Sequence, residues 1–243
     1  MATTGNPLRN IAIAATAVWN LGTLAAWGFT DITGHWNETC IRHLAKQNLV
    51  SGYPDGSFKP EAGITRAEFA ILALNTTRVF FHHSQGTRSG GGDFPDVPAS
   101  HWARDAIGEG YQYGLFTGYP DGRFQPDLPI PRVQSLVVLT NAINFRVPEN
   151  PTQFLNQQFD DAEGVPQWAQ KSIAAATLGR IAVNYPNPRQ LNPLRNATRA
   201  EIAAMMCQGR SFARTVPVEY IGGGDLDLAI VPEMGGVDSF ADG

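Results

Sequence analysis

The sequence has little of several features that would indicate a common class of protein. Only two cysteines, Cys40 and Cys207, occur in 243 residues, so there is neither a framework of several disulfides nor a cysteine-based zinc pattern. Whether these two cysteines pair is left open by the sequence. The formal net charge is −4, from 18 basic and 22 acidic residues. This balance argues against nucleic acid and against an acidic membrane surface as partners.

A long apolar run is also missing. Residues 11–19 are apolar, but Asn20 and several small residues follow them, so the run is too short and too interrupted for a membrane-spanning helix. With Ala26 and Gly28 as small residues at a cleavage site, residues 1–28 resemble a short signal peptide. A helix that docks on the rest of the chain is the alternative. We therefore expect export and no integral membrane span.

Patterns for catalysis and metal binding are absent as well. No nucleophile, base and orienting acid recur at matching positions, and there is no phosphate-binding loop. His82 and His83 have no companion metal ligands, and Asp55 and Asp121 lack the remaining ligands of a calcium loop. We expect no enzyme activity, no metal and no cofactor.

What the sequence does contain is a threefold repeat with a period of 66 residues. Two kinds of aromatic residue keep this spacing: Tyr53, Tyr119 and Tyr185, and Trp36, Trp102 and Trp168. Two independent markers with one period are a strong indication of repeated structural units. The copies are expected at residues 29–92, 93–158 and 159–214.

The first copy contains the most complete motif, GYPDGSFKPEAGITRAEFA. Its Asp55-Gly56 dipeptide tolerates the left-handed conformation of a tight turn. Thr65 and Glu68 have the spacing of a capping box, in which each side chain accepts a hydrogen bond from the backbone amide of the other residue. A helix should therefore begin at Arg66. A cation beside the free amides of a helix start is a good place to hold an anion.

These motifs resemble the S-layer homology (SLH) family of bacterial cell-wall-anchoring modules. The resemblance rests on Phe29-Thr30-Asp31, His35-Trp36, GYPDGSFKP and ITRAE in the first copy, and on their counterparts in the other two. It implies three modules with grooves between them that hold cell-wall polysaccharide, often carrying pyruvate ketals. It also implies that the arginine of TRAE meets the ketal carboxylate, while the glycine-rich loop offers backbone donors. A planar guanidinium can hold a carboxylate through two parallel hydrogen bonds.

The glycan-binding residues that this resemblance implies are Arg66, Gly52, Gly56, Arg199, Arg132 and Trp36. Arg66 is expected to lie near the two glycines of its own copy. The tryptophans could offer flat faces to sugar rings, but their position on a periodic apolar face favours burial in the core instead.

The three copies are not equal. The second replaces the capping threonine and glutamate by Pro131 and Gln134. The third replaces both glycines of GYPDG by Asn184 and Pro188, so its loop cannot take the same turn. Because the first copy alone carries the whole motif, we expect it to dominate binding.

The expected fold is mainly α-helical, with three helix–loop–helix modules in a pseudo-threefold arrangement around a central three-helix core. In the first helix of each copy, apolar or small residues follow the tryptophan at offsets of 5, 8 and 13, which trace one helical face. We therefore expect the first helices at the centre. Residues 82–92 are expected to form a flexible linker, and residues 145–158 a loop.

The expected function is non-covalent anchoring to a polysaccharide of the bacterial cell envelope, in the periplasm or at the cell surface. The alternative is a protein–protein scaffold of the envelope that uses the modules only as a frame. Residues 215–243 form an acidic, glycine-rich tail that we expect to be mobile, and a protein partner would bind there.

Overall fold

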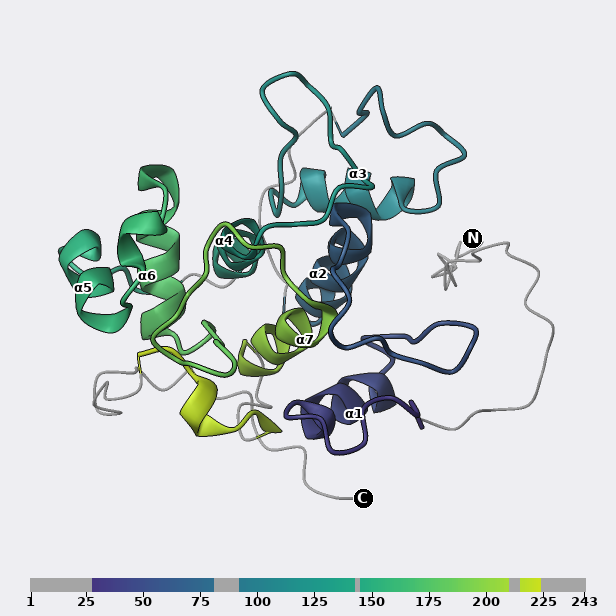
Figure 1. Cartoon of the computed structure of the whole chain (residues 1–243). Helices are drawn as coiled ribbons and strands as arrows, with labels where there is room; N and C mark the ends of the chain where they lie inside the picture. Colours follow the sequence, from purple (N-terminus) through teal and green to yellow (C-terminus); the bar gives the residue numbers. More distant parts are fainter. Residues whose placement is uncertain (1–27, 81–91, 143–144, 210–214, 224–243) are drawn as a thin grey trace, which may run out of the picture.

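The computed structural model describes residues 28–80, 92–142, 145–209 and 215–223 (Figure 1). Most of the expected leader and linker, and residues 224–243 of the tail, lie outside these ranges. Within them the chain forms α-helices joined by loops, with isolated β-bridges and no strand, so the mainly α-helical prediction is confirmed. None of the described helices is both long enough and apolar enough to cross a membrane. The α-helices are α1 (Glu38–Lys46), α2 (Arg66–Phe80), α3 (Arg104–Gln112), α4 (Arg132–Ala142), α5 (Pro151–Gln158), α6 (Gln170–Leu178) and α7 (Arg199–Gln208).

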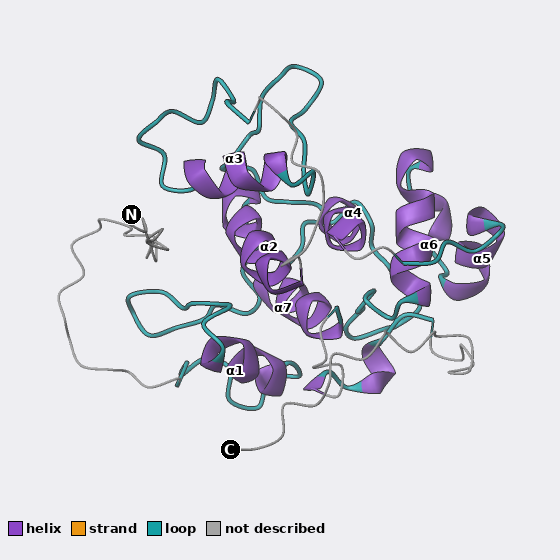
Figure 2. Cartoon of the chain, turned by 180° about the vertical axis from the view of Figure 1, so that it is seen from behind, coloured by secondary structure: helices purple, strands orange, loops and turns teal. Residues whose placement is uncertain are grey.

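The second helix of each copy lies at the centre, and the first helix lies outside, which is the reverse of the expected order (Figures 1 and 2). The central α4 contacts both α2 and α7. Each first helix packs on the second helix of another copy: α1 on α7, α3 on α2, and α6 on α4. The contacts therefore run in a cycle through the three copies.

Burial around the helix explains why the order is reversed. All ten residues of α7 are buried, including its polar ones, whereas α1 buries only Cys40, Ile41, Leu44 and Ala45. A helix with one apolar stripe belongs at the surface, and a helix that is buried on all sides belongs inside. The predicted apolar faces themselves are correct, because Ile107 and Ile173 are fully buried.

Two of the three tryptophans of the repeat lie outside the core, whereas Trp36 is partly buried and packs against it. Trp102 is 54% exposed and Trp168 is 62% exposed, so the expectation that they would be buried is wrong. Trp36 precedes the first residue of α1, Glu38, and so lies outside the helical face on which its burial was argued. Only the residues that follow it have the periodicity of that helix.

A ring of three backbone hydrogen bonds fixes the starts of the central helices. The amide of Ile64 donates to the carbonyl of Ala197 (3.2 Å), Ala197 donates to Ile130 (2.9 Å), and Ile130 donates to Ile64 (3.0 Å). These residues come just before α2, α4 and α7, so each copy supplies one side of the ring.

Residues 145–158, expected as a loop, contain the helix α5. Its N-cap Asn150 accepts a hydrogen bond from the amide of Gln153 at 3.1 Å, and Pro151 occupies the first helical position. Asparagine at the cap and proline at the next position favour a helix start, so the signal was present in the sequence. The helix packs against α6.

Candidate functional site

The capping box at the start of α2 has the predicted form. The amide of Glu68 donates to the hydroxyl of Thr65 at 3.2 Å, and the amide of Thr65 donates to the carboxylate of Glu68 at 2.8 Å. A second capping box joins Thr198 and Glu201 at the start of α7. These two helices therefore begin where the motif predicts.

The amides at these helix starts are not free to bind an anion. The amide of Arg66 donates to the carbonyl of Leu128 at 2.8 Å, and that of Ala67 donates to Pro126 at 2.9 Å. The starts of α4 and α7 make equivalent bonds to the copies beside them. The anion-binding role expected of these amides is therefore replaced by contacts between copies.

Each motif arginine reaches into the loop of another copy. Arg66 lies in the loop of the second copy, Arg132 in that of the third, and Arg199 in that of the first. The expected grouping of Arg66 with Gly52 and Gly56 is therefore not found. We call the three places the first, second and third sites, after the copy whose loop receives the arginine.

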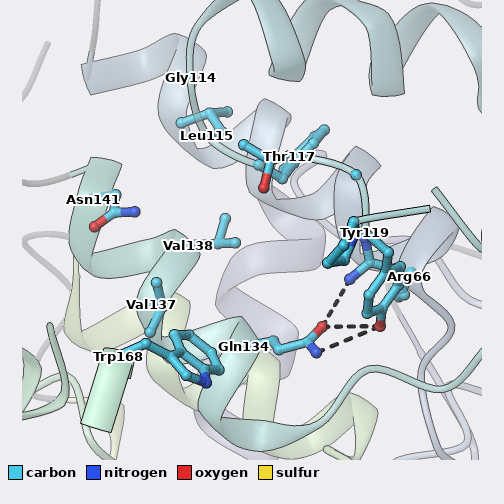
Figure 3. A pocket seen from close by; sticks show the side chains of 13 residues that line it. Arg66, Gly114, Leu115, Thr117, Tyr119, Gln134, Val137, Val138, Asn141 and Trp168 are labelled. Atoms are coloured by element: carbon cyan, nitrogen blue, oxygen red, sulfur yellow. Dashed lines mark hydrogen bonds between the residues drawn. The ribbon is translucent and has the colours of Figure 1, made fainter. Parts of the chain in front are cut away.

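The second site is a groove of about 560 Å³ (Figure 3). The Arg66 guanidinium donates from Nε to the carbonyl of Phe124 at 2.7 Å and from Nη1 to Oε1 of Gln134 at 2.8 Å. It lies over the Tyr119 ring, 4.5 Å from its centroid. Trp168, from the third copy, lines the groove and is largely exposed. Three copies thus contribute to one groove.

The first site has the same core of contacts. Arg199 donates from Nε to the carbonyl of Phe58 and from Nη2 to that of Ser51, both at 2.8 Å. Its guanidinium lies over the Tyr53 ring at 4.8 Å. Unlike the second site, it has a carboxylate nearby, because Glu68 lies 3.9 Å from Nη1.

In the third site the arginine itself is buried. Arg132 has no exposed surface, donates to the carbonyls of Leu191 and Val183, and forms an ion pair with Glu201 at 2.8 Å. Burial alone would raise the pKa of Glu201, but Arg132 and Arg195 hold this pKa below its ordinary value. The placement of Arg132 makes it part of the core, in contrast to the ligand-binding role expected of it.

Aromatic side chains line a pocket of about 340 Å³ at the third loop, to which Trp36, Tyr185 and Glu201 contribute. Trp36 stacks on Tyr185, with centroids 4.8 Å apart and planes 4° apart, and the Tyr220 ring meets both edge-on. Tyr220 belongs to residues 215–223, the start of the tail that was expected to be mobile. That expectation is wrong for this part, because the amide of Asn184 donates to the Tyr220 carbonyl and that of Gly222 donates to Ala182, each at 2.7 Å. The third loop does differ from the other two, as predicted.

The motif glycines build the loop of the first copy. A side chain on Gly52 would come within 2.4 Å of the Phe29 ring, and Gly56 has a φ of +80°. The amide of Gly56 donates to the carbonyl of Tyr53 at 2.9 Å, which closes the turn. This amide is therefore already occupied.

Sequence reasoning missed the aspartate that holds each loop. Asp96 accepts hydrogen bonds from the amides of Phe124 and Gln125 at 2.9 and 2.7 Å. Burial alone would raise the pKa of Asp96, but these two bonds bring it below its ordinary value. Asp31 and Asp161 make equivalent pairs of bonds in the other copies. An aspartate two positions after a phenylalanine in all three copies was the available signal.

Comparison with known proteins finds similar sequences among cell-surface and anchoring proteins. Residues 28–70 and 93–132 match the S-layer homology domain. A cellulosome-anchoring protein of Acetivibrio thermocellus is 34% identical over 151 residues, which cover 62% of this chain and 32% of that protein. The S-layer protein EA1 of Bacillus anthracis is 34% identical over 131 residues, which cover 54% of this chain and 14% of that protein.

A third relative has the name of an enzyme. The amylopullulanase of Thermoanaerobacterium thermosulfurigenes is 32% identical over 184 residues, which cover 73% of this chain but only 9% of the enzyme. The chain thus spans about a third or less of the length of each of these three relatives. Together with the repeated motifs, these matches identify S-layer homology domains at residues 28–70 and 93–132 of this chain.

Proposed function

We propose that this chain attaches non-covalently to a polysaccharide of the bacterial cell envelope, and that the second site is the main binding groove. The observation that carries the proposal is the groove of about 560 Å³ in which Arg66, Tyr119 and Trp168 meet. Pockets that bind small ligands combine apolar and aromatic walls with a few well-placed polar groups, and this groove has both.

The chemistry of the groove suits a carboxylated sugar. Trp168 offers an exposed flat face against which the apolar side of a sugar ring can pack. Arg66 provides the cation for a carboxylate, such as that of a pyruvate ketal. The first site, where Arg199 lies over the Tyr53 ring, is the second candidate. The third site has a smaller pocket of about 340 Å³, lined by Trp36 and Tyr185, but its arginine is buried.

We further propose that the chain works outside the cytoplasm. The names of the relatives refer to anchoring and to the S-layer. Cys40 and Cys207 form a disulfide, and such bonds persist in oxidising compartments. The enzyme relative shares only a small part of its length with this chain, so we propose that the chain supplies attachment and not catalysis.

Retention on purified cell-wall sacculi tests the proposal. The full chain should be retained on untreated sacculi and lost after mild acid treatment that removes ketals. Arg66→Ala should reduce retention, while Arg189→Ala, which removes an exposed ion pair with Asp160, is the matched control and should not. Absence of retention in folded protein would overturn the proposal. It would favour the alternative of a protein scaffold, with a partner at the acidic tail.

A further inference from the structure

One position differs in charge between the three sites, and it faces the arginine in each. Glu68 faces Arg199 in the first site, and Glu201 pairs with Arg132 in the third. In the second site the equivalent residue is Gln134, which accepts a hydrogen bond from Arg66. The second site thus has an amide where the other two have a carboxylate.

We propose that Gln134 is a specificity-determining residue that makes the second site selective for an acidic sugar unit. This inference rests on the proposed function of the groove. It adds that the second site prefers an acidic sugar unit and that Gln134 is the cause.

Arg66 is a nearly buried cation whose hydrogen bonds go to neutral acceptors. Only 7% of its surface is exposed, and its partners are the Phe124 carbonyl and the Gln134 amide. Among the described residues no carboxylate lies within ion-pair distance of it. A buried charge without a paired counter-charge retains an unfavourable desolvation energy, which an incoming anion offsets.

Asp96 does not remove this difference between sites. Its negative charge acts on Arg66 from the loop, but its carboxylate is bonded to two backbone amides. Asp31 and Asp161 hold the same position in the other sites. The aspartate is therefore common to all three sites, whereas Gln134 replaces a carboxylate that faces the arginine in the other two.

The amide of Gln134 also has a donor that a glutamate lacks. Its Oε1 faces Arg66, and its Nε2 lies 3.4 Å from the Tyr119 hydroxyl. A side-chain amide carries two N–H donors, so Gln134 can donate to a ligand carboxylate that a glutamate would repel. Figure 3 shows Arg66, Tyr119 and Gln134 gathered together, with Val137, Val138 and Trp168 along the same groove. The polar end would hold the acid, and the apolar walls would hold the sugar.

Two reciprocal variants and two probes test the inference. The probes are a methyl hexoside with a pyruvate ketal and the same hexoside with an isopropylidene ketal, in which a methyl group replaces the carboxylate. Binding to the full chain is followed by the NMR signal of the Trp168 indole, assigned with Trp168→Phe. We expect the unmodified chain to bind the acidic probe about tenfold more tightly than the neutral one, the usual effect of a hydrogen bond to a charged group.

Gln134→Glu should weaken binding of the acidic probe about tenfold and leave that of the neutral probe unchanged. Glu68→Gln, the matched change in the first site, should leave the titration at Trp168 unchanged. Equal affinity of the unmodified chain for both probes, or undiminished acid binding by folded Gln134→Glu, would overturn the inference. If sacculi still retain the unmodified chain in that case, the proposed function stands. If the sacculi do not retain the unmodified chain, the proposed function is contradicted as well.

Discussion

Cys40 in α1 and Cys207 in α7 are joined by a disulfide that spans 167 residues of sequence. The bond connects the first helix of the first copy to the second helix of the third copy, and these two helices also pack together. It therefore fixes α7 of the third copy against α1 of the first copy. A cross-link that closes a long loop stabilises a protein mainly by restricting its unfolded chain.

Reduction of this disulfide should lower the free energy of unfolding by about 2–5 kcal/mol. Chemical denaturation of the full chain, with and without a phosphine reductant, measures the change. The double variant Cys40→Ser, Cys207→Ser should resemble the reduced protein and ignore the reductant. An unchanged midpoint in protein whose thiols are shown to be reduced would contradict the prediction.

Removal of the cap on α2 should have a smaller effect. Thr65→Ala loses the acceptor for the amide of Glu68, and loss of such a cap typically costs about 1 kcal/mol. Thr65→Ser keeps the hydroxyl and should stay close to the unmodified protein. Equal unfolding midpoints for the alanine and serine variants would mean that the cap contributes nothing.

A cavity in α3 should destabilise the whole chain and not only the second copy. Ile107 is fully buried, and α3 packs on α2 of the first copy. Ile107→Ala should therefore lower the free energy of unfolding by about 2–5 kcal/mol while the chain still unfolds in one transition. Separate transitions seen by calorimetry would show that the copies fold independently.

Local features of the fold could be predicted from the sequence. The Thr65–Glu68 capping box and the buried face of Ile107 depend on residues close together in the chain, and both are found. The position of the second helices at the centre could not be predicted from one helical face. Burial on the remaining sides depends on neighbours from other copies, although the apolar residues all round α7 were a signal.

The sequence could not predict which loop receives each arginine. Arg199 bonds to Ser51 and Phe58, which precede it by well over a hundred residues. A motif shows which residue types belong to a site, but in a cyclic arrangement it does not show which copy supplies each one. For the same reason the sequence left open whether Cys40 and Cys207 pair. The residues of the first motif are divided between the first and second sites.

Acid should lower the stability of the folded protein at the third site, because it protonates Glu201. Arg132 and Arg195 hold its pKa below the ordinary value of 4.5 in the folded protein. The ionised carboxylate thus stabilises the fold above that value, and this contribution is lost as the pH falls through the folded-state pKa. Glu201→Gln keeps a residue suited to the capping box but cannot ionise.

The difference in melting temperature between the unmodified protein and Glu201→Gln should therefore be largest near neutral pH. It should shrink as the pH falls below 4.5. Glu163→Gln, at a residue for which no ion pair is found among the described residues, serves as the control for a general charge effect. A difference that stays constant from neutral to acid pH would contradict the role of the ionised Glu201.

The last prediction ranks the three arginines in retention on sacculi. Arg66→Ala should cause the largest loss, because Arg66 lines the open groove and no carboxylate among the described residues pairs with it. Arg199→Ala should cause a smaller loss, because Glu68 offsets part of its charge. Arg66→Lys should restore only part of the retention, since an ammonium lacks the fork that holds a carboxylate.

Arg132→Ala should act on stability instead. It removes the buried partner of Glu201 and leaves only the partly exposed Arg195 beside this carboxylate. Breaking a buried pair typically costs about 3–5 kcal/mol when no partner remains, so we expect a loss below this range. Circular dichroism and the unfolding midpoint of each variant separate this effect from a loss of binding. Equal losses of retention from all three variants, each still folded, would mean that the sites are equivalent. In that case neither the carboxylates beside Arg199 and Arg132 nor the aromatic side chains at the third site would limit access of the glycan.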